Sequence, residues 1–227
     1  MDDARIAELL IPFLSDSPRL RGHEGSASAS DAAVLSPTQL RSISTYIDLL
    51  LKWNSRINLT AIRDPSEIVQ RHFGESLFAA KYALEQKSVD TAIDLGSGAG
   101  FPGVPLAMLA PDVQVTLIES QQKKATFLKE LIYALGLKNL KVFGDRAESY
   151  SGTADLVMLR AVERFEQALQ MAIRLTRTGG RIALMIGSGQ VELARKLGIS
   201  VDWSDPVQIP GGHSRELLSG AKRVEVE

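Results

Sequence analysis

The sequence predicts an α/β protein, with a Rossmann-like parallel sheet covered by helices on both faces and a helical extension before it. From residue 89 onward, short apolar segments alternate with longer segments of helical periodicity, a pattern typical of a parallel sheet. The first apolar segment runs into a glycine-rich loop at residues 96–103, after which a helix begins. At 227 residues, 44% of them hydrophobic and 23% charged, the chain is long enough to bury one sizeable core.

The part before the sheet is expected to hold a flexible segment and two helices. Residues 1–35 have a weakly apolar start and then a small, polar composition, so we expect a flexible N-terminal segment without a function. Ser36 and Pro37 are typical of a helix start, and apolar residues at helical spacing extend that helix to about Trp53. The Asp64–Glu67 segment has the pattern of a capped second helix.

The sheet region contains four helices between its predicted strands. We therefore divide the chain into residues 1–35, a helical extension at 36–88 and a ligand-binding domain at 89–227. The carboxyl ends of parallel strands meet at one edge, where α/β sheets bind ligands. Residues 202–220 are rich in turn formers, and only 223–226 alternate like a last edge strand. The predicted strands are 89–95, 113–119, 139–143, 154–159 and 180–187, and the helices are 103–110, 121–135, 163–177 and 190–197.

The glycine loop fits two ligand-binding patterns. Residues 98–103 match G-x-G-x-x-G of dinucleotide sites, whereas residues 94–100 match D-x-G-x-G-x-G of S-adenosylmethionine-dependent methyltransferases. Because the strand ends near Leu95, the second pattern begins in the right place. A carboxylate at the strand tip, Asp94, also suits a ligand that carries an amine and a sulfonium. The loop residues that we expect at the cofactor are Asp94, Gly96, Ser97, Gly98, Gly100 and Phe101.

Other polar residues follow the later strands. Glu119 ends the second strand about 20 residues after the loop, where a carboxylate can accept both ribose hydroxyls. Ala147 and Glu148, after the third strand, are candidates to contact the adenine edge. Arg160 ends the fourth strand, where a guanidinium can neutralise a phosphate or carboxylate, or stack on a base.

Composition limits the other classes of function. The chain has no cysteine, and its three histidines are far apart, so we expect no metal. No apolar run approaches the roughly 20 residues that cross a bilayer, and the start is acidic, so we expect a cytoplasmic protein without a membrane partner. The net charge is −1, but residues 123–146 and 160–196 lean basic, which leaves a local basic face for nucleic acid.

From these residues alone, several functions remain open. Glu119 and the second glycine pattern also suit a nicotinamide-dependent oxidoreductase. A small-molecule methyltransferase, or a module that binds cofactor and RNA without transferring a methyl group, would have the same pocket.

A set of further motifs resembles the bacterial small-subunit rRNA guanine-N7 methyltransferases, the glucose-inhibited division protein B family. The resemblance implies methyl transfer from S-adenosylmethionine to N7 of a specific guanine in 16S rRNA, with small-subunit rRNA or the assembled subunit as the partner. We expect the protein to act as a monomer. Gly96, Phe101, Ala147, Glu148 and Arg160 would contact the cofactor, with Glu119 at its ribose. The substrate-positioning candidates are Trp53, Asn54, Asn58, Arg63, Arg71 and Arg160. The matching residues are 51–54, 57–60, 63–65, 71–73, 93–105 and 160–161.

The chain departs from this family at Gly74 and Glu75, at Ile186, and in the C-terminal strand, which matches the family poorly. Gly74 and Glu75 stand where the family usually has Leu-Asp, so we expect a softened helix with the charge retained. Ile186 stands where a lysine is common, so any contact made by that lysine is absent or supplied elsewhere.

Guanine N7 has a lone pair and no proton, so the reaction needs no general base. We therefore assign no catalytic residue, and His72 also receives no catalytic role.

Overall fold

The computed structural model describes residues 1–15, 35–212 and 214–224. In these residues the chain forms an eight-stranded sheet in the order β3-β2-β1-β4-β5-β8-β6, with β7 paired to β8. The first five strands are parallel and the last three pair antiparallel, which confirms the predicted Rossmann-like class. The strands are β1 Thr91–Leu95, β2 Gln114–Ile118, β3 Leu140–Phe143, β4 Ala154–Arg160, β5 Thr176–Gly187, β6 Val201–Trp203, β7 Val207–Gln208 and β8 Arg215–Lys222.

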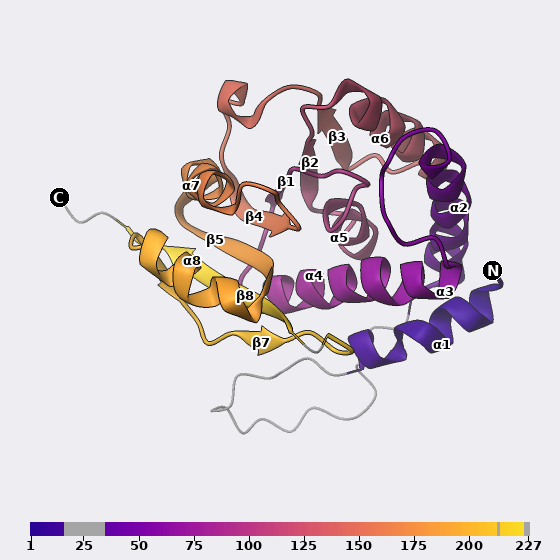
Figure 1. Cartoon of the computed structure of the whole chain (residues 1–227), viewed down its shortest axis with the longest axis horizontal. Helices are drawn as coiled ribbons and strands as arrows, with labels where there is room; N and C mark the ends of the chain where they lie inside the picture. Colours follow the sequence, from indigo (N-terminus) through magenta and orange to yellow (C-terminus); the bar gives the residue numbers. More distant parts are fainter. Residues whose placement is uncertain (16–34, 213, 225–227) are drawn as a thin grey trace.

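Helices cover both faces of the sheet (Figure 1). Successive strand residues such as Ala92 and Ile93 belong to two different apolar cores, one on each face, because side chains alternate along a strand. One core includes residues of α1 to α6, and the other includes residues of α7 and α8. The helices described are α1 Asp3–Leu14, α2 Pro37–Asn54, α3 Pro65–Ile68, α4 Glu75–Gln86, α5 Gly103–Leu109, α6 Gln122–Leu135, α7 Phe165–Leu175 and α8 Val191–Leu197.

The N-terminal residues contain an ordered helix that the sequence did not predict. Helix α1 buries Ile6, Leu10 and Phe13 and lies against α2 and α4 (Figure 1). The expectation of a flexible segment was therefore wrong for residues 3–14, whose apolar face is stabilised by tertiary packing. Residues 16–34 lie outside the described residues, and the domain boundaries at residues 36 and 89 stay a prediction.

The capped start at Asp64 is confirmed, since the Asp64 carboxylate accepts the Glu67 N–H at 2.8 Å. The helix that follows is interrupted by a π-helical turn at Val69–Gly74, a feature frequent at functional sites. A Cβ at Gly74 would lie 2.5 Å from Cδ2 of Phe13. Glycine at this position thus allows α1 to pack against the turn, and the expected softening of the helix stays a prediction.

Two boundaries in the C-terminal half differ from the prediction. Helix α7 ends at Leu175 and β5 begins at once, with a register shift against β4 before Arg181. The last strand in the described part of the chain is residues 215–222, inserted between β5 and β6. Of the edge strand expected at 223–226, residues 223 and 224 are not in a strand, and 225 and 226 lie outside the described residues. The middle of β8 is buried on both faces, so its sequence lacks the alternation by which half-buried strands are recognised.

Candidate active site

The glycine loop leaves its backbone bare at the carboxyl end of β1. Gly96, Gly98 and Gly100 have φ values of +74°, +55° and +95°, the left-handed region that glycine adopts without strain. A Cβ at Gly100 would also lie 2.6 Å from the hydroxyl oxygen of Tyr46, which donates a hydrogen bond to the Ala99 carbonyl. The loop therefore needs glycine both for its path and for its contact with α2.

Asp94 is buried beneath this loop. One carboxylate oxygen accepts the Gly103 N–H at 2.9 Å at the first residue of α5, and the other is buried without a hydrogen-bond partner. Burial raises the pKa of Asp94 to about 7. The structure gives Asp94 the role of tying the loop to α5, and it places the carboxylate behind the crevice and not in its wall.

Glu119 holds the opposite side of the loop. Its carboxylate accepts the Gly98 N–H at 2.9 Å and the Gln121 N–H at 2.7 Å. Together with Gly96, Ser97, Gly98 and Phe101, it lines a crevice of about 460 Å³. This brings the loop and the predicted ribose acceptor to one site at the ends of β1 and β2.

The wall facing the glycine loop comes from the N-terminal helices. The His72 ring stacks on Phe101 with centroids 4.9 Å apart, and its Nε2 lies 2.7 Å from Oγ1 of Thr60. Burial, together with the nearby Arg160 and Arg71, lowers the pKa of His72 to about 3. The imidazole is thus neutral at physiological pH and forms part of a polar and aromatic wall.

A second hollow of about 350 Å³ continues the crevice past Gly96 and Glu119. Ala147 and Glu148, the candidates for the adenine edge, line this hollow. Arg174 of α7 donates to the Ala147 carbonyl at 2.6 Å and so fixes this turn.

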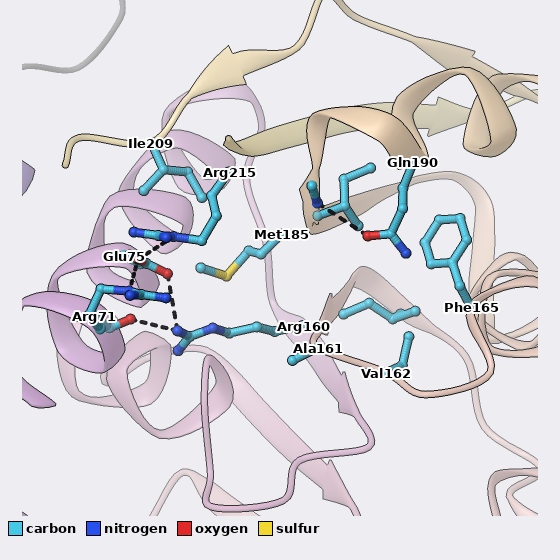
Figure 2. A pocket seen from close by; sticks show the side chains of 13 residues that line it. Arg71, Glu75, Arg160, Ala161, Val162, Phe165, Met185, Gln190, Ile209 and Arg215 are labelled. Atoms are coloured by element: carbon cyan, nitrogen blue, oxygen red, sulfur yellow. Dashed lines mark hydrogen bonds and ion pairs between the residues drawn. The ribbon is translucent and has the colours of Figure 1, made fainter. Parts of the chain in front are cut away.

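Arg160 and the two residues after it separate the crevice from a third cavity of about 230 Å³, since all three line both hollows. Figure 2 shows the Arg160 side chain extending from the end of β4 towards Glu75 and Arg71 of the N-terminal helices. Ala161 has φ +50°, an uncommon conformation for a residue other than glycine. This turn directs Val162 back towards the cavities.

The other substrate-positioning candidates lie in different places. Trp53 donates to Glu130 at 3.0 Å and contacts Phe127 on α6. Asn54 is buried and accepts the N–H groups of residues 59 and 60 at 2.9 and 3.0 Å, which fixes the segment that bears Thr60. Asn58 and Arg63 are exposed, and Arg71 lines the third cavity.

Several residues that line these cavities, including Lys124, Glu75 and Arg215, were not among the predicted site residues. Lys124 lines the crevice, and Glu75 and Arg215 line the third cavity. The spacing of Arg71 and Glu75, four residues apart on a helix, was an available signal for an ion pair. Arg215 had none, because β8 was not recognised. In the described residues, no cluster of His, Asp and Glu has the arrangement of a metal site, and no helix is long and apolar enough to cross a membrane.

Comparison with known proteins gives a consistent result. The family model described as rRNA small subunit methyltransferase G matches residues 39–210. A protein named ribosomal RNA small subunit methyltransferase G from Stenotrophomonas maltophilia is 38% identical over 192 residues, 83% of this chain and 87% of the relative. Another from Roseiflexus castenholzii is 39% identical over 197 residues, 81% of this chain and 83% of the relative. The cofactor-bound structure of Rv0187 from MTB has the same fold, with a TM-score of 0.58 at 18% identity, over 82% of this chain and 91% of that one.

Proposed function

We propose that the crevice at the ends of β1, β2 and β4 is the active site of an enzyme of the rRNA small subunit methyltransferase G family, to which the chain belongs. The enzyme transfers a methyl group from S-adenosylmethionine to N7 of a guanine in 16S rRNA. The observation that carries the assignment is the bare glycine loop beside Glu119. Family membership also decides against the oxidoreductase and the small-molecule methyltransferase that the sequence motifs left open.

The residues present suit the cofactor. Gly96 and Gly98 have positive φ values, which a residue with a Cβ adopts only under strain, so the loop presents bare backbone to the crevice. The Glu119 carboxylate in the crevice wall can accept hydrogen bonds from ribose hydroxyls. The pocket beside Ala147 and Glu148 lies where the adenine would extend. When bound, the cofactor supplies an electrophilic methyl group on a sulfonium.

The protein's part in the reaction is alignment. Guanine N7 attacks through an in-plane lone pair and loses no proton, so the site has to orient the base and exclude water. The positive charge passes from the sulfonium to the purine during the reaction, and no new charge has to be stabilised. A neutral His72 is compatible with this chemistry, because no proton has to be removed from the base.

The partner is small-subunit rRNA, free or in the assembled subunit. We propose that the protein acts as a monomer in the cytoplasm.

The test is transfer of labelled methyl from S-adenosylmethionine to small ribosomal subunits isolated from cells that lack this protein, followed by identification of the modified nucleoside. Label in 7-methylguanosine is the expected result. Absence of label, with demonstrable cofactor binding, would contradict the proposal and favour a binding module.

A further inference from the structure

Three arginines from separate parts of the chain converge on one carboxylate in the third cavity (Figure 2). The Glu75 side chain is 2% exposed, and its oxygens lie 3.0 Å from Nε of Arg71, 3.0 Å from Nη2 of Arg160 and 2.8 Å from Nε of Arg215. The three arginines come from the π-helical turn, β4 and β8. We call these four residues the arginine cluster.

The arginine cluster carries excess positive charge. Three guanidinium groups face one carboxylate, which leaves two positive charges. The next carboxylate, that of Glu67, lies 3.9 Å from Nη1 of Arg71, and the Glu67 side chain is half exposed. The Nη1 atom of Arg160 is buried without a hydrogen-bond partner, and the side chain as a whole is only 12% exposed. Like charges held close together repel one another unless an anion compensates them, so the cavity suits a negatively charged ligand.

The arginine cluster is adjacent to the proposed reaction site. Arg160, Ala161 and Val162 line both this cavity and the crevice. The rest of the cavity is lined mainly by apolar residues, including Met185 beside the arginines and Phe165 next to Gln190 (Figure 2). A group bound to the arginines would therefore lie within the reach of one nucleotide from the crevice.

Building on the proposed function, we propose that the arginine cluster binds a backbone phosphate of the RNA substrate next to the target guanosine. In RNA complexes arginine commonly contacts the phosphate, the O6/N7 edge of guanine or, by stacking, the face of a base, and of these only the phosphate compensates excess positive charge. Here N7 is the reacting atom, and a guanidinium on that edge would occupy the lone pair that must face the methyl group. The planar guanidinium donors match the oxygens of a phosphate, so the excess charge serves to position the backbone.

Salt dependence of RNA binding tests this assignment. Removal of one arginine–phosphate interaction should reduce the slope of log affinity against log salt by about 0.7–0.9. We would measure equilibrium binding to small subunits from cells lacking this protein, over a range of KCl concentrations, for wild type, Arg215→Gln, Arg215→Lys and Arg223→Gln. Arg223 is a matched control, because it follows the same strand but pairs with exposed Asp202. Methyl transfer would be followed in the same samples, and thermal unfolding would verify that each variant is folded.

We expect Arg215→Gln to bind more weakly with a slope reduced by about 0.7–0.9, Arg215→Lys to retain the slope, and Arg223→Gln to match wild type. A wild-type slope in Arg215→Gln, whatever its affinity, would overturn the proposal and leave the arginine cluster a structural tie between α4 and the sheet. Binding with the expected slopes but without methyl transfer in wild type would instead refute the proposed function, while the phosphate interaction would stand.

Discussion

The arginine cluster makes the stability of the protein sensitive to a substitution that removes the charge of Glu75. We expect Glu75→Gln, which keeps the size of the side chain, to destabilise the protein by about 3 kcal/mol, because removal of one partner of a buried ion pair costs about 3–5 kcal/mol. The lower end applies here for two reasons. Arg160 keeps the Arg71 carbonyl at 2.6 Å, and the Arg71 and Arg215 side chains are 37% and 28% exposed, so water can still solvate them.

The assay is urea unfolding at pH 7, followed by the fluorescence of Trp53 and Trp203. For a chain of this size, a loss of about 3 kcal/mol also corresponds to a melting temperature lower by roughly 6–12 °C. Glu67→Gln is the matched control, since Glu67 is on the same helical segment and near the same Arg71 but is 49% exposed and 3.9 Å away. We expect that control to lose less than about 0.5 kcal/mol. A loss below about 1 kcal/mol for Glu75→Gln, or equal losses in both variants, would refute the reasoning.

Three further predictions concern the crevice. Glu119→Gln should weaken S-adenosylmethionine binding about 10- to 100-fold, because a hydrogen bond to a charged group contributes about 1.5–3 kcal/mol. Calorimetry measures the affinity, and an unchanged value would argue against hydrogen bonds from the ribose hydroxyls to Glu119. Burial raises the pKa of Asp94 to about 7, so between about pH 4 and pH 7 the folded state binds more protons than the unfolded state, and the stability of the protein falls as pH rises. Asp94→Asn should remove this part of the pH dependence of stability, measured by urea unfolding at several pH values. Parallel stability profiles of wild type and variant would contradict this prediction. Gly100→Ala should lower the free energy of unfolding by more than about 2 kcal/mol, since the new Cβ would lie 2.6 Å from Tyr46 and the backbone φ is +95°. Gly136→Ala, at φ +63° with nothing within 4 Å of the new Cβ, should lower it by only about 1–2 kcal/mol. Equal losses of stability would show that the contact with Tyr46 does not matter.

The elements that sequence reasoning located best are those whose signals are local. The glycine loop, Glu119 and the capped helix start at Asp64 each depend on residues within a few positions of one another, and the structure places the loop and Glu119 in one crevice. Strand and helix limits in the parallel part differ by a few residues, because periodicity identifies an element better than its ends.

The elements that sequence reasoning missed depend on tertiary contacts. Helix α1 is short and acquires its stability by packing Phe13 against Gly74. Strand β8 is buried on both faces, and Gly220 admits β6 so closely that a Cβ would meet Val201 at 2.5 Å. No local pattern encodes either of these contacts.

Sequence patterns were sufficient for the fold class, the family and the cofactor loop, because glycines, strand-end carboxylates and periodic apolar residues act through local backbone geometry and burial. Three-dimensional packing was needed to establish that Asp94 lies behind the crevice, that Asn54 fixes a neighbouring segment, and that Arg71, Arg160 and Arg215 share one carboxylate. Arg71 and Arg215 are 144 positions apart in the sequence numbering, and they meet because the antiparallel insertion of β8 beside β5 brings the end of the chain back to the N-terminal helices.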